Sequence, residues 1–265
     1  MAKHFTMLGI CHVPVAMMYH SPSHKAELVT QLLAGEQVEV LEVEQSWLLV
    51  MRLNDHLKGW VDRKMIEILL EGEDETITQL FAGMVKAPLQ AARDQYGRSF
   101  WLPGGATLYN HGSSIAVAPG RNLEEDIRQQ LYIPEFTTRK ALIKTALAYN
   151  GAPFLWGGKT IFGIDCAGLV QMIFELNGIQ LPRHLDQQVE AGKVVSFNDE
   201  SQPGDLAFFE NAEGGIVHAG IIMDQGRIIH AFGEVRVDLL DHEGIFNKNT
   251  RQYTHKLRVI KNIID

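Results

Sequence analysis

The order of the secondary-structure patterns in its second half most constrains how this chain can fold. After Pro134, the segment TTRKALIKTALAYNG (137–151) has threonines suited to a helix N-cap, apolar residues at helical spacing and a closing glycine. A second helical pattern covers 166–177 and ends at Gly178. Three strand-like runs separated by turn residues follow at 205–210, 217–224 and 227–232. Helices first and strands afterwards predict an α+β domain.

The first half of the chain shows short strand-like runs. The segment QVEVLEVE (37–44) alternates apolar and polar residues, the run 47–53 follows it, and 59–62 comes after a turn-like break. This spacing predicts a small antiparallel barrel. Short strands recur between residues 78 and 120, where Pro103-Gly104-Gly105 is the strongest break. They predict a second barrel.

A short acidic stretch, EGEDE (71–75), separates the two barrel-like parts and is interpreted as a linker. A chain of 265 residues has room for two or three domains, each with its own core. We therefore predict small β-barrels at 1–72 and 73–133 and an α+β domain at 134–265.

Composition and charge exclude several classes of protein. Hydrophobic residues make up 46% of the chain and charged residues 21%, as in ordinary soluble proteins. A net charge of -8, with both signs interspersed, gives no attraction for nucleic acid or anionic lipid. The apolar stretch at the start is broken by His12 and Pro14, which argues against a signal peptide. We expect a cytoplasmic protein, the alternative being an exported one whose signal segment is not in the sequence.

The two cysteines, Cys11 and Cys166, make neither a disulfide framework nor a four-thiolate zinc site. Any chemistry at either one is therefore that of a single thiol. Cys11 lies in an apolar, strand-like run and is expected to be buried. The closest histidine pair, His20 and His24, is interrupted by Pro22, and we expect no metal and no cofactor.

Cys166 falls where the second helical pattern begins, with Asp165 at the cap position. A helix N-terminus and a neighbouring imidazole both favour the thiolate. His218 and His230 lie on consecutive predicted strands, where one face can bring them within hydrogen-bond reach. The three side chains could then be nucleophile, base and orienting group. A single cysteine is more often a small buried residue, so these residues alone leave both interpretations open.

Six sequence blocks, in order, resemble the NlpC-type cysteine peptidases of bacterial cell-wall metabolism. The blocks are FLWGG (154–158), GIDCAGLVQ (163–171), GIQLPR (178–183), QPGDLAFF (202–209), VHAGIIM (217–223) and IIHA (228–231). The resemblance implies a papain-like α+β domain with Cys166 as nucleophile, His218 as general base and His230 as the residue that orients His218. With two barrels in front, the whole chain is similar to the subgroup with bacterial SH3-like domains.

That subgroup cleaves the γ-D-glutamyl bond to a diamino acid in peptidoglycan stem peptides and prefers a free N-terminal L-alanine. The resemblance therefore implies peptidoglycan-derived peptides as partners. In the subgroup a first-barrel glutamate binds the substrate amine, which points to Glu27 in HKAELVTQLLAGEQV (24–38). Asp165 is carried over as a substrate contact, and Trp156 is expected to line the pocket. A solvated carboxylate at Glu27 and a simple helix cap at Asp165 are the structural alternatives.

The chain departs from the family pattern at positions expected to face the substrate. Phe154 replaces a tyrosine, Ala167 replaces a serine, and Arg183-His184 stands where arginine-aspartate is usual. In the first barrel Leu57 replaces a tyrosine. Each polar partner lost in a desolvated pocket costs about 1–3 kcal/mol for a substrate that needed it. Because the three catalytic residues are kept, we expect altered N-terminal specificity.

Two other functions fit the same residues. The departures could mark a peptidoglycan-fragment-binding protein with weak or lost hydrolase activity. A thioester at Cys166 could also pass its acyl group to an acceptor other than water, as in an acyl or amide transferase.

Overall fold

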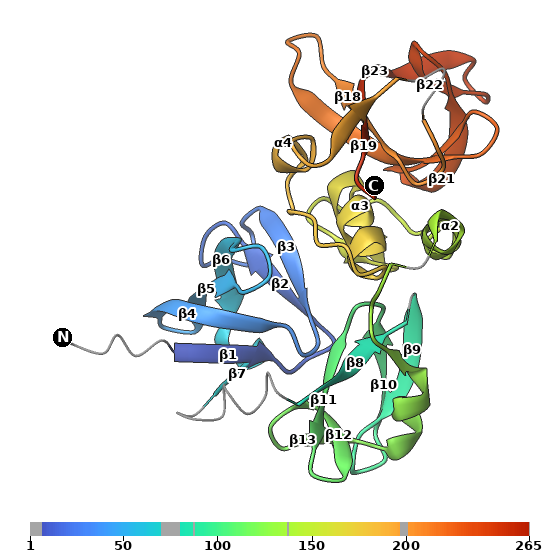
Figure 1. Ribbon diagram of the computed structural model, residues 1–265. Coiled ribbons are helices and arrows are strands. Elements are labelled where there is room, and N and C mark those ends of the chain that lie inside the picture. Colours follow the sequence, from blue (N-terminus) through green and yellow to red (C-terminus); the bar gives the residue numbers. More distant parts are fainter. Residues whose placement is uncertain (1–6, 70–79, 87, 137, 197–200, 265) are drawn as a thin grey trace. The chain divides into compact units, whose positions relative to one another are not determined.

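The computed structural model describes residues 7–69, 80–86, 88–136, 138–196 and 201–264. The chain divides into two compact units, Met1–Pro134 and Glu135–Asp265. In Figure 1 the first is coloured from blue to green and the second mostly from yellow-green to red. The predicted linker at 71–75 lies outside the described residues.

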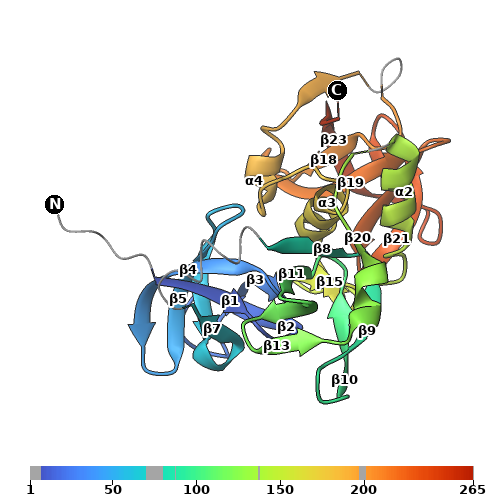
Figure 2. The same cartoon turned by 60° about the horizontal axis from the view of Figure 1, so that its bottom comes forward.

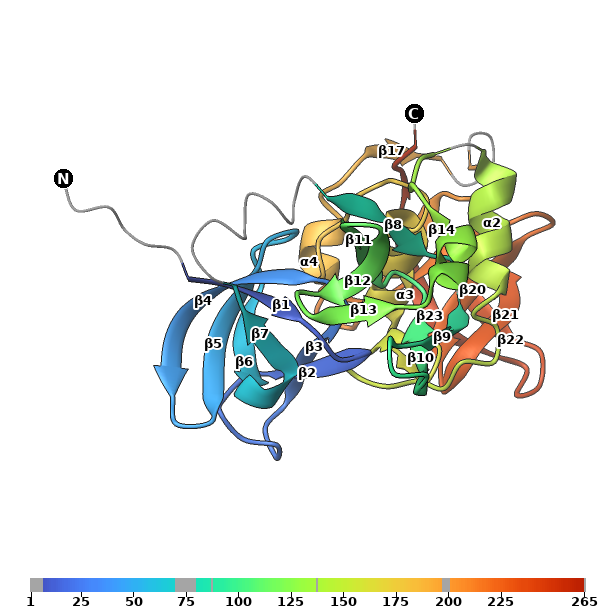
Figure 3. The same ribbon diagram turned by 90° about the horizontal axis from the view of Figure 1, so that it is seen from below.

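The first part of the N-terminal unit is a seven-stranded antiparallel sheet, which Figure 3 shows with β4, β5 and β6 side by side. Its strands are β1 (Met7–Cys11), β2 (Val15–Tyr19), β3 (Leu28–Leu33), β4 (Gln37–Glu44), β5 (Trp47–Arg52), β6 (Lys58–Asp62) and β7 (Ile66–Ile68). They pair in the order β3-β2-β6-β5-β4-β1-β7. The strands predicted at 37–44, 47–53 and 59–62 are confirmed as β4, β5 and β6.

Alternation along these strands builds the core of this sheet. Val38 and Val40 of β4 and Leu48 and Val50 of β5 point to one face and are buried, while their neighbours in the two strands are mostly more exposed. Cys11 packs in the same core, as predicted, and is completely buried.

The second part of the N-terminal unit again consists of short antiparallel strands. They are β8 (Phe81–Val85), β9 (Leu89–Arg93), β10 (Ser99–Pro103), β11 (Thr107–His111), β12 (Ser114–Ala118), β13 (Arg121–Leu123) and β14 (Leu131–Tyr132). Five of them pair in the order β13-β12-β11-β8-β14, and β9 pairs with β10. The predicted break at Pro103-Gly104-Gly105 is the turn between β10 and β11, where Gly105 has a φ of 90°.

Within the N-terminal unit, the two parts meet at Gly35. Its φ is 79°, and a Cβ there would lie 1.8 Å from the carbonyl oxygen of Thr107. The Thr107 N–H donates to Ala34 O at 2.8 Å, and the Tyr109 hydroxyl donates to Gly35 O at 2.6 Å. A side chain at position 35 would therefore separate the two sheets.

Three helices precede most of the sheet in the C-terminal unit. They are α2 (Arg139–Leu147), α3 (Cys166–Glu175) and the short α4 (Leu185–Gln188). The predicted helices at 137–151 and 166–177 are confirmed, and the hydroxyl of Thr138 caps α2 by accepting from Ala141 N at 3.0 Å. Every residue of α3 is buried, and α3 contacts α2, β19 and β20. Figure 2 shows α3 against these strands.

The strands of the C-terminal unit form a seven-stranded antiparallel sheet. They are β17 (Lys193–Val195), β18 (Leu206–Glu210), β19 (Ile216–Met223), β20 (Arg227–Phe232), β21 (Glu234–Leu240), β22 (Gly244–Asn247) and β23 (Gln252–Asn262), with a separate pair β15 (Lys159–Thr160) and β16 (Gly163–Ile164). The order is β17-β23-β18-β19-β20-β21-β22, and β22 also pairs with β23. This last pairing closes β18 to β23 into a barrel (Figure 1).

The three strands predicted in this unit are confirmed as β18, β19 and β20. The tight turn between β19 and β20 contains Gln225 and Gly226, with φ values of 62° and 61°. The strands β21, β22 and β23 were not predicted from the sequence. Among the described residues, none of the helices has the length and apolar character that crossing a membrane requires.

Candidate active site

Cys166 is the first residue of α3 because Asp165 caps the helix. Asp165 Oδ1 accepts a hydrogen bond from Gly168 N at 2.6 Å, the usual N-cap contact. A Cβ at position 168 would lie 2.2 Å from the carbonyl oxygen of Gly158, so glycine lets the helix start lie against this loop. The thiol of Cys166 is thereby fixed at the N-terminus of a buried helix.

A chain of hydrogen bonds runs across β19, β20 and β21. His218 Nε2 lies 2.8 Å from His230 Nδ1, and His230 Nε2 lies 3.1 Å from Asp238 Oδ2. All three side chains are buried. Arg236 pairs with the same carboxylate, with its Nη2 at 3.0 Å from Oδ1 and its Nε at 2.8 Å from Oδ2. The predicted neighbours His218 and His230 therefore do lie within hydrogen-bond distance.

These hydrogen bonds determine which nitrogen of each imidazole ring carries the proton. Burial acts to raise the pKa of Asp238, but its bonds to His230 and Arg236 hold it below the usual range, so the carboxylate is ionised and only accepts. His230 Nε2 must then carry a hydrogen, and its Nδ1 accepts one from His218 Nε2. The Nδ1 of His218 is left with a lone pair that can take up a proton.

Aromatic side chains enclose the ring of His218. His255 of β23 stacks on it with ring centroids 4.1 Å apart and planes at 23°, and Phe209 of β18 lies at 5.8 Å. His255 also meets Phe232 edge-on at 4.9 Å. Three strands other than its own thus restrict how the His218 ring can turn.

Burial favours the neutral forms of both the Cys166 thiol and the His218 imidazole. It raises the pKa of Cys166 to about 11, with the charge of Asp165 adding to the effect and hydrogen bonds from the backbone of Ala219 and Ala167 opposing it. Burial, followed by the neighbouring rings of His255 and His230, lowers the pKa of His218 well below its usual value. The thiolate expected from the helix N-terminus is therefore not the resting state, because desolvation outweighs the helix dipole here. The backbone of Ala219, the residue after His218 in β19, hydrogen-bonds the Cys166 thiol, so β19 lies against the start of α3.

Asp165 is also held by a buried ion pair with Arg183. Its Oδ2 accepts from Arg183 Nη2 at 2.6 Å and from Gly157 N at 2.8 Å. Both side chains of the ion pair are buried. This carboxylate thus ties together the start of α3, the loop at Gly157 and the segment before α4.

The remaining predicted site residues differ in how far their side chains are exposed to solvent. Phe154 and Trp156 are 40% and 62% exposed. Ala167 is buried, with its carbonyl accepting from Gln188 Nε2 at 3.0 Å, and His184 is exposed at the N-cap of α4. Glu27 lies in the N-terminal unit, exposed, immediately before β3.

Sequence reasoning missed two groups of this site, Asp238 and His255. Both lie on strands that were not predicted. The alternation of EVRVDLL (234–240) places Asp238 on the polar side with Glu234 and Arg236, so the pattern gave no sign that its side chain is buried. His255 lies in β23, where it shares the apolar phase of QYTHKLRV (252–259) with Tyr253, Leu257 and Val259, a strand signal that the sequence analysis did not use.

His218, His230 and His255 also form a group whose ligand nitrogens lie within 4.8 Å of one another. A metal ion would fit poorly here. His230 is hydrogen-bonded through Nδ1 to His218 and through Nε2 to Asp238, so both of its nitrogens are already engaged. The donor set suits a hydrogen-bonded relay better than coordination.

Comparison with known proteins gives this geometry a context. Residues 151–255 match the NlpC/P60 family, and residues 18–66 match the bacterial dipeptidyl-peptidase SH3 domain. Dipeptidyl-peptidase 6 of Lysinibacillus sphaericus is 29% identical over 267 residues, covering 89% of this chain and 93% of that protein. The γ-D-glutamyl-L-lysine dipeptidyl-peptidase of Bacillus subtilis is 37% identical over 113 residues, covering 41% of this chain and 38% of that protein.

Solved structures show the same fold. An NlpC/P60 family protein from Bacillus cereus superposes with a TM-score of 0.81 at 19% identity, covering 97% of this chain and all of that one. An NlpC/P60 endopeptidase from Photobacterium damselae subsp. piscicida gives 0.71 at 16% identity, covering 97% of this chain and 71% of that one. The chain therefore carries an NlpC/P60 peptidase domain at residues 151–255 and a bacterial SH3 domain at residues 18–66, and its relatives include proteins named as dipeptidyl-peptidases.

Proposed function

We propose that this protein is a papain-like cysteine peptidase that hydrolyses the γ-D-glutamyl bond to a diamino acid in peptidoglycan stem peptides. Cys166 is the nucleophile, His218 the general base and His230 the residue that orients it. The observation that carries the proposal is the hydrogen-bonded chain from Asp238 through His230 to His218, because it leaves His218 Nδ1 as a proton acceptor. We propose domain limits of 1–72, 73–133 and 134–265.

In the acylation step, Cys166 Sγ attacks the scissile carbonyl carbon as its proton moves to His218 Nδ1. The C–N bond then breaks, the imidazolium returns the proton to the leaving amine, and a thioester remains on Cys166. The backbone N–H of Cys166 at the helix start is placed to stabilise the oxyanion. Water gives a proton to His218 and its oxygen to the thioester, which releases the acid and restores the thiol.

The low pKa of His218 supports this order of events. A base whose pKa lies well below 6.5 is neutral at pH 7 and needs no prior deprotonation. Ionised Asp238 then stabilises the imidazolium charge that forms transiently across the two rings.

The substrate class is supported by the relatives, two of which are named for dipeptidyl-peptidase activity, one of them on γ-D-glutamyl-L-lysine bonds. Exposed Phe154 and Trp156 offer an apolar wall for the peptide. Asp165 and Arg183 act on the substrate through the position of the α3 start, since they bind each other.

We propose a changed preference at the substrate N-terminus. Phe154, Ala167, His184 and Leu57 stand where the family places tyrosine, serine, aspartate and tyrosine, so four polar side chains or charges that could meet an amine are replaced. At about 1–3 kcal/mol for each unpaired contact, a substrate that needs two of them would bind at least about 30-fold more weakly.

The test is cleavage of L-Ala-γ-D-Glu-L-Lys and of N-acetylated and N-terminally extended versions of it, followed by mass spectrometry. Cys166→Ala should abolish cleavage. Cys11→Ala is the matched control, because it removes the other thiol from a barrel core in the N-terminal unit. Undiminished cleavage by Cys166→Ala would overturn the proposal.

The replaced positions also favour a second candidate, a peptidoglycan-fragment-binding protein with weak or lost activity. Saturable binding of these peptides without turnover by the wild-type chain would establish it. A thioester transferase would give products in which an added amine, in place of water, is joined to the glutamyl group.

A further inference from the structure

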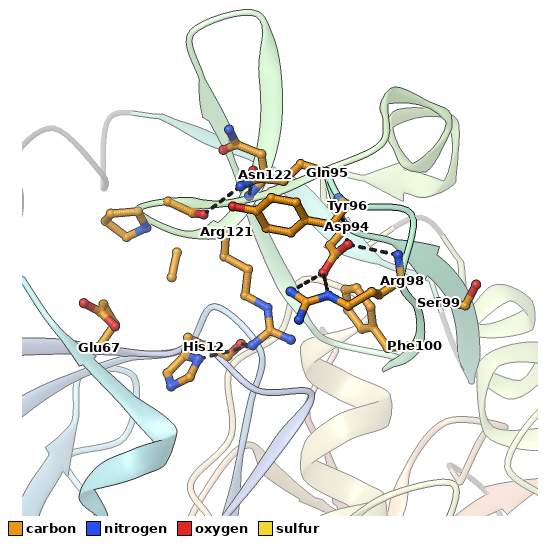
Figure 4. A pocket seen from close by; sticks show the side chains of 13 residues that line it. His12, Glu67, Asp94, Gln95, Tyr96, Arg98, Ser99, Phe100, Arg121 and Asn122 are labelled. Carbon is orange, nitrogen blue, oxygen red and sulfur yellow. Dashed lines mark hydrogen bonds and ion pairs between the residues drawn. The ribbon is translucent and has the colours of Figure 1, made fainter.

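The N-terminal unit contains a cavity with a volume of about 550 Å³, a size typical of small-molecule sites. Figure 4 shows it from close by. Its walls are the turn between β9 and β10, the turn between β12 and β13, and His12 and Glu67 from the first sheet. Every residue that lines it belongs to the N-terminal unit, and none of them is among the residues predicted for the Cys166 site.

Arg121 enters this cavity and is anchored by one of its three nitrogens. Its Nη1 donates to the carbonyl oxygen of His12 and to His12 Nδ1, the latter at 3.2 Å. His12 Nε2 lies 2.8 Å from Lys64 O. A carbonyl only accepts, so Nε2 carries the hydrogen of this ring and Nδ1 the lone pair. His12 is thus neutral and positions Arg121 without compensating its charge.

The other edge of the Arg121 guanidinium is unused. A guanidinium has five N–H groups, and both hydrogens of Nη1 are engaged by His12. Within the described part of the chain, Nε and Nη2 donate to no acceptor and form no ion pair. These two nitrogens form the planar fork that binds both oxygens of a carboxylate. The ring of Phe100 lies 5.4 Å from the guanidinium carbon and covers one face of it.

The acidic groups beside the cavity do not neutralise this fork. Asp94 Oδ2 accepts from Arg98 Nε at 2.7 Å, and its Oδ1 accepts from the backbone N–H groups of Tyr96 and Arg98. Glu67 is exposed. Burial lowers the pKa of Arg121, although the charge of Asp94 opposes this. A partly desolvated cation without a bound anion is unfavourable, and an anionic ligand would relieve it.

We propose that this cavity is a binding site for a small organic carboxylate, whose two oxygens accept bidentate hydrogen bonds from Nε and Nη2 of Arg121. Phe100 and Tyr96 supply an aromatic wall for the body of the ligand, and Tyr96 is 74% exposed and accessible. The two carboxylates nearby, Asp94 and Glu67, disfavour a dianion, so a monoanionic carboxylate is preferred over phosphate. Short peptides and N-acylated amino acids belong to this class.

The direct test is the Arg121 side-chain Nε–H resonance in the NMR spectrum of the full ¹⁵N-labelled chain. Titration with N-acetyl-L-phenylalanine should shift this resonance saturably, and the matched neutral ligand N-acetyl-L-phenylalanine amide should not. Inorganic phosphate should bind more weakly than the carboxylate. No saturable shift with the acid, an equal shift with the amide, or tighter binding of phosphate would each overturn the proposal.

Variants test the fork itself. Arg121→Gln should weaken carboxylate binding by at least about tenfold, and Arg121→Lys, which keeps the charge but lacks the fork, should retain part of it. Arg128→Gln is the control, since Arg128 pairs with Glu125 and does not line the cavity. Unchanged affinity in Arg121→Gln would contradict the assignment. The wild-type resonance decides the question even if a variant fails to fold.

Discussion

Replacing Asp238 by asparagine tests the hydrogen-bonded chain of the active site with the smallest possible change in shape. An asparagine has one carbonyl oxygen, whereas the carboxylate serves both His230 and Arg236. If that oxygen turns to Arg236, the amide group donates to His230 Nε2. The proton of His230 then moves to Nδ1, and His218 must accept at Nε2 and carry its own proton on Nδ1. In that state His218 cannot take a proton from Cys166.

The magnitude follows from the bonds that are lost. A hydrogen bond to a charged group is worth about 1.5–3 kcal/mol, and one such bond separates the productive from the unproductive arrangement. Since each 1.36 kcal/mol is a factor of ten in rate, kcat should fall by about 10- to 150-fold. KM should change little, because Asp238 is buried beneath His230 and reaches the reaction only through the two rings.

Steady-state cleavage of the γ-glutamyl peptide, with kcat and KM measured separately, is the assay. Asp241→Asn is the matched control: this carboxylate is also held ionised, by Tyr253 at 2.6 Å and by backbone N–H groups, and it contacts neither histidine. Thermal unfolding of both variants checks that the fold is kept. A folded Asp238→Asn variant with wild-type kcat would refute the relay.

Three further outcomes follow from the packing around α3. The rate of Cys166 alkylation by iodoacetamide should rise about tenfold per pH unit from pH 7 to 9 without a plateau, because a pKa of about 11 leaves the thiolate fraction rising throughout this range. Cys11, with a pKa of about 12 and no exposure, should stay unlabelled. A plateau near neutral pH would instead indicate a preformed thiolate–imidazolium pair. Arg183→Met should lower the free energy of unfolding, measured in urea, by about 3–5 kcal/mol, since it leaves the Asp165 charge buried without its cation. An unchanged value would mean that backbone N–H groups alone are enough to stabilise the buried carboxylate. Gly168→Ala should destabilise the chain by about 1–3 kcal/mol and reduce kcat, because its Cβ displaces the start of α3 from the loop it contacts; wild-type stability and kcat together would contradict this.

The parts of the fold that local pattern determines were predictable. The strand at 37–44 alternates over its first half, and the helix beginning at Cys166 has a cap, an apolar pattern and a terminal glycine, so both were found from the sequence. The strands β21 to β23 carry mixed patterns. Their positions depend on pairing between distant segments, which local propensity does not encode.

The active-site residues likewise divide into those that local sequence pattern predicted and those that it did not. The neighbourhood of His218 and His230 followed from consecutive strands joined by a tight turn, and the short distance between their rings agrees with it. Asp238 and His255 come from strands that were not predicted. The protonation state of Cys166 could not be foreseen either, because the helix position favours the thiolate, and only the packing shows how completely the sulfur is removed from water.

The closure of the C-terminal barrel by β23 has a consequence for how the enzyme is made. The nascent chain emerges from the ribosome with its N-terminus first, so Cys166, His218 and His230 emerge before residues 252–262. Until those residues arrive, β18 and β22 each lack the neighbour that β23 supplies, and the ring of His218 lacks the stacking of His255. The N-terminal unit can fold from contacts within itself long before that. The C-terminal unit therefore cannot close its barrel, or stack His255 on His218, until β23 has been synthesised.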